Sequence, residues 1–232
     1  MGGCPILISV VTCTRREHML NNILENFQRQ TVVDKELIII LNKTGMKFEA
    51  APDENVRVFS LDDGVTLGEC LNFGISQACF PVIAKFDDDD YYAPKYVENS
   101  LNFMKESKAD VVGKAAVFVY FKKKRLLTLF RPHLHHTFVK REFLSGATLC
   151  FQKEVWECVP FRKLNTGEDT EFQRDCLRQD IRLYSGGFQD FAVIRYGEEH
   201  GHTWKVEDET FMNHCRKMAV TETFEDFVGG ES

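Results

Sequence analysis

The stretch Val82-Ile-Ala-Lys-Phe-Asp-Asp-Asp-Asp-Tyr-Tyr92 places four consecutive aspartates directly after a short apolar run. The run Val82–Phe86 is typical of a short buried strand. Adjacent carboxylates repel one another, so Asp87–Asp90 is either a solvated acidic turn or a site that holds a hard divalent cation through oxygen ligands. At the carboxyl end of a strand, the cluster occupies the position where open α/β sheets bind their ligands. The rest of the chain has to decide between the two interpretations.

Apolar runs and amphipathic patterns alternate along the first half of the chain. Further strands are predicted at Ile6–Thr12, Glu36–Leu41 and Val56–Ser60. Helices are predicted between them, with apolar stripes that begin at Leu20, at Leu67 and just after Pro94. This alternation predicts an α/β fold with βαβ units and a mainly parallel central sheet flanked by helices. The sequence has neither a G-x-G-x-x-G fingerprint nor a Walker A motif, which argues against a dinucleotide site and excludes a P-loop.

The second half has shorter predicted elements. The expected strands are 110–121, 126–130, 143–151, 182–185 and 191–196, and the expected helices are 153–158, one that opens at Gly167, and a tail helix over 207–218. The run Lys122–Arg125 between two strands is predicted to be a solvated hairpin tip. We expect a single domain over residues 1–232, with a nucleotide-sugar-binding half at 1–110 and an acceptor and catalytic half at 111–232.

Composition favours a globular protein that stays in the cytoplasm. Hydrophobic residues make up 44% of the 232 residues and charged residues 28%. The 29 basic and 35 acidic residues give a net charge of −6, which argues against a nucleic-acid partner. No signal peptide or transmembrane segment is evident, and the eight cysteines contain no C-x-x-C pair, so we expect reduced thiols. The apolar residues of the predicted tail helix leave a homo-oligomer possible.

From Ile6 to about Trp204, the chain resembles the family 2 glycosyltransferases of GT-A fold. The segment Asp87-x-Asp89-Asp90-x-x-x-Pro94 matches the family's D-x-D-D-x-x-x-P run, and Glu168–Asp169 followed by Phe172 looks like its Glu-Asp motif. Further similarities are the first strand through Arg16, Asn42 after the second strand, the Leu67–Gly74 segment, and Arg195–Trp204, where the family can supply a histidine near the metal.

The sequence departs from the pattern of this family in two places. Leu71 stands where many members have an arginine before the asparagine of the third motif. The Gln-x-x-Arg-Trp motif of processive synthases is absent. The resemblance therefore implies a small enzyme that adds one sugar.

The resemblance also implies roles for particular residues. Asp89 would bind Mn²⁺ or Mg²⁺ directly, Asp87 would contact the ribose or a metal-bound water, and His200 or His202 could add a third metal contact. Asp169 would be the general base, with Glu168 orienting it or binding the acceptor. The residues expected to hold the nucleotide are Thr12, Arg16, Asn42, Asn72 and Asp87.

The reaction implied is metal-dependent, inverting transfer of one sugar from a nucleoside-diphosphate sugar to a hydroxyl, in glycan or cell-envelope polysaccharide synthesis. UDP is the expected nucleotide, followed by dTDP, and the acceptor could be a glycan, a lipid carrier, a protein or a small molecule. Two alternatives stay open. A sugar-nucleotide nucleotidyltransferase has related metal chemistry, although Thr12–Arg16 lacks the glycine-rich loop of that class. An inactive nucleotide- or glycan-binding module would keep the motifs without turnover.

Overall fold

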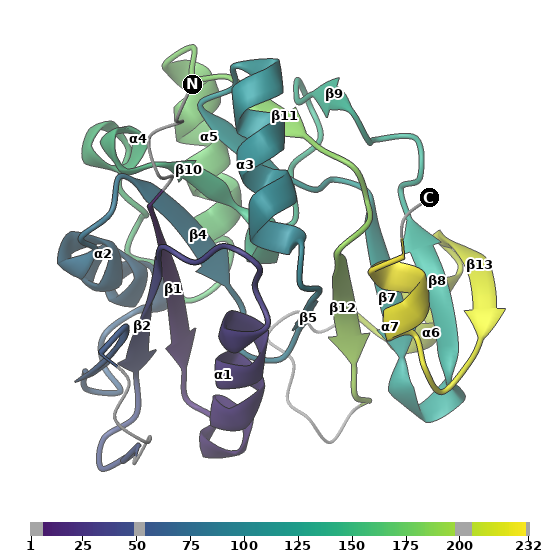
Figure 1. Cartoon of the computed structure of the whole chain (residues 1–232), viewed down its shortest axis with the longest axis horizontal. Coiled ribbons are helices and arrows are strands. Elements are labelled where there is room, and N and C mark those ends of the chain that lie inside the picture. The colour runs from purple at the N-terminus through teal and green to yellow at the C-terminus, as the bar shows by residue number, and fades with distance from the viewer. Residues whose placement is uncertain (1–6, 49–53, 198–205, 231–232) are drawn as a thin grey trace.

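The architecture consists of two β-sheets and the helices that cover them, as seen in a computed structural model (Figure 1). The structure describes residues 7–48, 54–197 and 206–230. An eight-stranded sheet has the order β3-β2-β1-β4-β10-β6-β11-β9, and a five-stranded sheet has the order β13-β8-β7-β12-β5. None of the helices in these ranges combines the length and the hydropathy that crossing a membrane requires.

The larger sheet has a parallel half and a mixed half. Its parallel half, which confirms the predicted βαβ pattern, consists of β1 (Ile8–Thr14), β2 (Lys35–Leu41), β3 (Val56–Ser60) and β4 (Val82–Phe86). The short strand β10 (Cys150–Gln152) lies antiparallel between β4 and β6 (Val111–Gly113). Beyond β6 come β11 (Leu183–Ser185), which is parallel to it, and β9 (Thr137–Phe138) at the edge.

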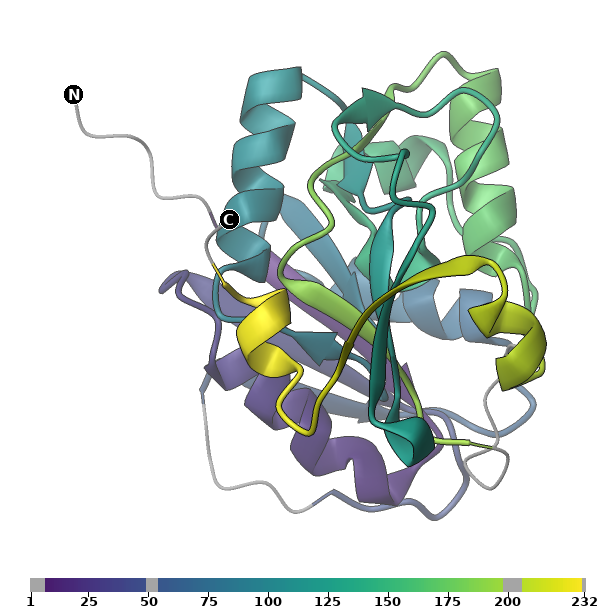
Figure 2. The same ribbon diagram turned by 90° about the vertical axis from the view of Figure 1, so that its right-hand side faces the viewer.

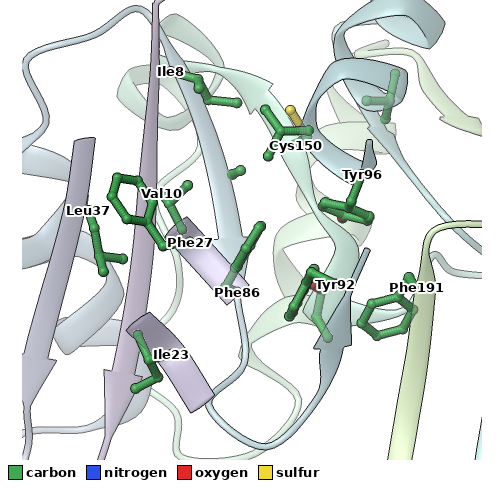
Figure 3. Packing of buried hydrophobic residues seen from close by; sticks show 14 of the residues in the cluster. Ile8, Val10, Ile23, Phe27, Leu37, Phe86, Tyr92, Tyr96, Cys150 and Phe191 are labelled. Carbon is green, nitrogen blue, oxygen red and sulfur yellow. The ribbon is translucent and has the colours of Figure 1, made fainter. Parts of the chain in front are cut away.

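Helices cover both faces of this sheet. Successive residues of a strand point to opposite faces, so each buried strand packs against helices on both sides. Val10 packs in a cluster with the apolar stripes of α1 (Leu20–Gln28) and α3 (Tyr96–Ser107), part of which is drawn in Figure 3. Its neighbour Val11 packs in a second cluster, on the other face, with residues of α2 (Leu67–Gln77), α4 (Lys153–Cys158) and α5 (Glu168–Arg178). The apolar strands therefore form a core that is buried on both faces, and the loops that carry the site extend from the ends of these strands.

The smaller sheet begins where the acidic run ends. Strand β5 (Tyr91–Tyr92) pairs with β12 (Phe191–Arg195), which runs parallel to β7 (Val117–Phe121). Strands β7 and β8 (Leu126–Phe130) form the predicted hairpin, with an exposed tip at 122–125. In Figure 2 the C-terminal segment lies at the edge of this sheet that faces the viewer, with α6 (Asp208–Met212) at one end and α7 (Glu225–Val228) at the other.

Three predicted elements are wrong in part. The tail helix over 207–218 ends at Met212, and Cys215–Val220 instead forms β13, which pairs with the open edge of β8. The strand predicted at 143–151 is reduced to β10, because residues 146–148 form a 3₁₀ turn, η3. The strand predicted at 110–121 divides into β6 and β7, because the chain passes from one sheet to the other there.

Candidate active site

The acidic run forms the turn between β4 and β5, at the carboxyl edge of the parallel sheet. Strand β1 is the parallel neighbour of β4, and its last residue, Thr14, donates a hydrogen bond from Oγ1 to the Asp88 carboxylate. Arg16, two residues further on, donates from Nε to Asp88 Oδ2 at 3.1 Å. The loop after β1 and the acidic turn after β4 are therefore fastened to each other through charge-assisted hydrogen bonds.

Two of the four aspartates have roles within the protein. Asp88 and Asp90 are 4% and 6% exposed. Asp90 Oδ1 accepts a hydrogen bond from the Ile194 backbone N–H at 3.1 Å, which ties the turn to β12. Burial raises the pKa of both carboxyl groups, and the charge of Asp89 adds to the effect on each. These two side chains shape the turn.

The other two aspartates are more accessible and suit a divalent cation. The side chain of Asp87 is 40% exposed and that of Asp89 is 15% exposed. Arg16 Nη1 lies 2.9 Å from Asp89 Oδ2. Among the described residues, no three His, Cys, Asp or Glu side chains converge as they would in a site built from protein ligands alone. Two carboxylates nevertheless fit Mg²⁺ or Mn²⁺, because such ions commonly take their remaining ligands from substrate phosphates and water.

Lys85 lies beneath these carboxylates and connects them to helix α5. It precedes Asp87 by two residues and therefore shares its face of the strand, and its ammonium forms an ion pair with Asp87 Oδ1. Lys85 is 5% exposed. Burial alone would lower the pKa of this lysine, but the charges of Asp87, Glu168 and Asp169 raise it above its ordinary value. The acidic turn and the Glu-Asp pair thus meet around one buried cation.

Glu168 and Asp169 open helix α5, where negative charge is favoured by the helix dipole. Glu168 is 5% exposed. Burial, together with the charges of Asp169 and Asp87, raises the pKa of Glu168 to about 7, although Lys85 acts in the opposite direction. Asp169 is half-buried, and its Oδ1 accepts a hydrogen bond from the Thr170 N–H at 2.6 Å. The pair therefore combines a carboxyl that titrates near neutral pH with a more accessible carboxylate.

The predicted nucleotide-binding residues differ in position and in how free their side chains are to contact a ligand. Arg16 and Asn42 lie just after the carboxyl ends of β1 and β2. Asn42 is 3% exposed, its Oδ1 accepts from Arg15 Nε at 2.8 Å, and its Nδ2 donates to the Asp62 carbonyl at 2.7 Å. Thr12 is fully buried, and its hydroxyl has no hydrogen-bond partner among the described residues. The Asn72 amide is occupied in holding the loop after α4, because its Nδ2 donates to the Phe161 carbonyl at 2.8 Å and its Oδ1 accepts from Trp156 Nε1 at 2.8 Å.

Three residues at the site were missed in the sequence. They are Thr14, the last residue of β1, Arg15, which follows it, and Lys85, which lies within the apolar strand β4. The twofold period of a strand was the available signal, because it places Thr12 and Thr14 on one face and Lys85 and Asp87 on another.

The predicted metal-binding histidines, His200 and His202, lie outside the described residues. Tyr196, which directly follows β12, comes shortly before these histidines in the sequence and has a perturbed pKa. Burial, followed by the charges of Asp89 and Asp90, raises the pKa of Tyr196 to about 12. The side chain of Tyr196 therefore lies near the acidic turn.

The raised pKa of Glu168 predicts a specific dependence of stability on pH. The folded protein holds this proton up to about pH 7, whereas an unfolded chain releases it near pH 4.3. The free energy of unfolding should therefore fall as pH rises through these values, by about 4 kcal/mol in total for this group. Glu168→Gln, which imitates the protonated form, should match wild type at pH 4.5 and be more stable by up to that amount at pH 8.

Urea unfolding of both proteins in EDTA at the two pH values measures this difference. Glu154→Gln is the matched control, because Glu154 also lies in the first turn of a helix but is exposed. A difference between Glu168→Gln and wild type that is the same at pH 4.5 and pH 8 would contradict the prediction.

Comparison with known proteins agrees with this geometry. The sequence model described as "Glycosyl transferase family 2" matches residues 9–154. The O-antigen biosynthesis glycosyltransferase WbnJ of Escherichia coli is 27% identical over 191 residues, which cover 78% of this chain and 67% of WbnJ.

Solved structures share the fold at low sequence identity. S. aureus TarS 1-349 in complex with UDP-GlcNAc has a TM-score of 0.65 and 16% identity, over 89% of this chain and 64% of that one. The mannosyltransferase PcManGT from Pyrobaculum calidifontis, in complex with GDP-Man and Mn²⁺, has a TM-score of 0.59 and 12% identity, over 89% of this chain and 62% of that one. The chain thus spans a little over three fifths of these two proteins. Because the family match extends over well more than half of its length and its sheets follow the same architecture, the chain belongs to glycosyltransferase family 2 and is a glycosyltransferase of GT-A fold.

Proposed function

We propose that this enzyme transfers one sugar from a nucleoside-diphosphate sugar to a hydroxyl group, with a divalent metal and with inversion at the anomeric carbon. The observation that supports this most strongly is that Lys85 relates Asp87 to the Glu-Asp pair, since its ammonium forms an ion pair with Asp87 and its pKa is also raised by the charges of Glu168 and Asp169. Asp87 and Asp89 suit the binding of a leaving diphosphate with its cation. Glu168 and Asp169 suit the activation of an incoming hydroxyl.

On the leaving-group side, Asp89 and Asp87 would hold Mn²⁺ or Mg²⁺, with one of His200 and His202 as a further ligand. When bound, the metal supplies Lewis-acid stabilisation of the negative charge that develops on the diphosphate. Arg16, which already contacts Asp89 at 2.9 Å, is placed to add a fixed positive charge there. The exposed Arg15 would contact the nucleotide, while Asn42 and Asn72, whose amides are both bonded within the protein, would position the loops around it. Thr12 is fully buried and would not contact the nucleotide.

On the acceptor side, Asp169 would take the proton from the acceptor hydroxyl. The acceptor oxygen then forms a bond to the anomeric carbon on the face opposite the diphosphate, and the bond from that carbon to the diphosphate oxygen breaks. The electron pair leaves with the nucleoside diphosphate, so one displacement inverts the configuration. Glu168, whose pKa is raised to about 7, can donate a hydrogen bond that orients the acceptor when it is protonated, and the Lys85 ammonium supplies positive charge beside the pair.

The relatives support the choice of substrates. TarS is solved with UDP-GlcNAc, and PcManGT with GDP-Man and Mn²⁺, which favours a nucleoside-diphosphate sugar as donor and a divalent metal as cofactor. WbnJ is named for O-antigen biosynthesis, which favours a role in polysaccharide synthesis. Among donors, we propose a UDP-sugar first and a dTDP-sugar second.

Thermal unfolding with a panel of nucleoside diphosphates, each with Mn²⁺ and with EDTA, tests the donor side. A ligand at 100 times its Kd adds about 2.7 kcal/mol to the free energy of unfolding. We expect one diphosphate to raise the melting temperature in Mn²⁺ and to have a much smaller effect in EDTA. The absence of a shift with every diphosphate would contradict the proposal and favour an inactive module.

A further inference from the structure

Gly146 lies directly against the candidate base. It begins the 3₁₀ turn η3 (Gly146–Thr148), and a Cβ built on it would lie 1.8 Å from Asp169 Oδ2, 2.6 Å from Asp169 Cγ and 2.8 Å from Asp169 Cβ. The backbone of Gly146 does not have a positive φ, so the position requires the absence of a side chain rather than an unusual conformation. Because Asp169 Cβ is itself too close, a rotation of the Asp169 side chain could not relieve the contact.

Helix α5 is fastened to the residues that precede η3. Gln173, one turn after Asp169, is fully buried. Its Oε1 accepts from the Leu144 N–H at 2.8 Å and its Nε2 donates to the Leu144 carbonyl at 3.1 Å. The chain next to Leu144 is held as well, because the Ser145 N–H donates to the Lys114 carbonyl at 2.8 Å.

The other side of η3 is fastened to the metal-binding turn. The Tyr92 hydroxyl donates to the Ala147 carbonyl at 2.7 Å and accepts from the Asp87 N–H at 2.8 Å. Tyr92 is fully buried, and its ring stacks on Phe86 at a centroid distance of 3.7 Å (Figure 3). Tyr96 adds a bond from its hydroxyl to the Thr148 carbonyl at 3.0 Å. Hydrogen bonds therefore hold η3 and the residue before it on both sides.

We propose that Gly146 is a positioning residue that fixes where the Asp169 carboxylate stands relative to the metal-binding carboxylates. The η3 turn acts as a spacer between the acidic turn and Asp169. The Tyr92 hydroxyl links the Ala147 carbonyl of η3 to the backbone of Asp87, and Gly146 lies directly against Asp169. An added methyl group, confined by these bonds, displaces the base rather than the turn. This inference rests on the proposed role of Asp169 in catalysis.

Gly146→Ala should lower kcat by about 100-fold, because a displacement of the order of 1 Å at a reacting group costs about that much. The KM for the nucleotide sugar and the Kd for the nucleoside diphosphate with Mn²⁺ should stay within about threefold, a separation that general destabilisation of the protein would not produce. Rates are measured as release of nucleoside diphosphate from the nucleotide sugar that wild type consumes. Gly229→Ala is the matched control, because a Cβ there would meet atoms no nearer than 3.4 Å.

A double-mutant cycle shows whether the effect passes through Asp169. Since Asp169→Ala removes the carboxylate whose position Gly146 is proposed to set, adding Gly146→Ala to it should lower kcat by less than about threefold further. A Gly146→Ala enzyme within threefold of wild type, beside an inactive Asp169→Ala enzyme, would overturn the inference and leave the proposed function intact. An active Asp169→Ala enzyme would instead overturn the role of Asp169, and the inference with it. Independent losses that multiply in the double variant would also overturn the inference.

Tyr92→Phe tests the same spacer if Gly146→Ala does not fold. It keeps the stacked ring and removes only the hydroxyl that joins Asp87 to Ala147. We expect kcat to fall about tenfold, in line with the loss of an orienting contact. Tyr120→Phe, which also loses one bond to a backbone carbonyl, but to that of Thr221 rather than Ala147, should keep the wild-type rate. Equal rates for Tyr92→Phe and Tyr120→Phe would contradict the spacer.

Discussion

Asp169→Asn is expected to lower kcat by 100-fold or more and to leave nucleoside-diphosphate binding within about twofold of wild type. The amide has nearly the shape of the carboxylate and can still accept from the Thr170 N–H, but it cannot take a proton from the acceptor. General-base catalysis contributes about 10²–10⁴-fold. Steady-state kinetics and calorimetric titration of the diphosphate in Mn²⁺ separate the two effects.

The control for this variant is Asp180→Asn. Asp180 is an exposed aspartate just beyond α5, in a left-handed conformation that asparagine also adopts readily. Its rate should equal that of wild type. An Asp169→Asn enzyme that retains the wild-type rate would show that the base lies elsewhere.

Asp89→Ala is expected to abolish the contribution of the metal to nucleotide binding. The Kd for the nucleoside diphosphate in Mn²⁺ should weaken by about 100-fold or more, since even residues that only support metal ligands are worth about 10–100-fold in metal affinity. Binding should then be equal in Mn²⁺ and in EDTA. The protein should remain folded, because Arg16 keeps its hydrogen bond to Asp88. Calorimetric titration with and without metal measures both values.

Asp34→Ala is the matched control for the metal prediction. Asp34 is exposed and precedes β2, at the amino end of the sheet, away from the acidic turn. Its variant should bind as wild type does. Metal-dependent binding that survives in Asp89→Ala would remove Asp89 from the metal site.

The parallel half of the fold could be predicted because three of its four strands, β1, β2 and β4, are buried on both faces. Such strands appear as continuous apolar runs, as in Glu36–Leu41 and Val82–Phe86. The same reasoning placed the acidic run at a carboxyl edge. That Glu168 and Asp169 are opposite this run was expected only from the family resemblance, because no pattern in the chain relates α5 to β4.

The errors have a common physical origin in long-range pairing. Cys215–Val220 has a pattern compatible with a helix, but the free edge of β8 offers partners to five of its six residues. Gly146–Thr148 departs from the predicted strand because bonds from distant side chains, including Tyr92 and Tyr96, hold its carbonyls. Likewise, the sequence does not reveal that the Asn72 amide is occupied by the loop after α4.

The most direct test of the account is phosphorus NMR of the wild-type protein with a panel of UDP- and dTDP-sugars, octyl glycosides as acceptors, and either Mn²⁺ or EDTA. We predict that one nucleotide sugar is converted to its nucleoside diphosphate in Mn²⁺ and not in EDTA. Formation of pyrophosphate or of a sugar 1-phosphate would instead indicate nucleotidyl transfer, and unchanged spectra for the whole panel would contradict the assignment of these carboxylates to sugar transfer.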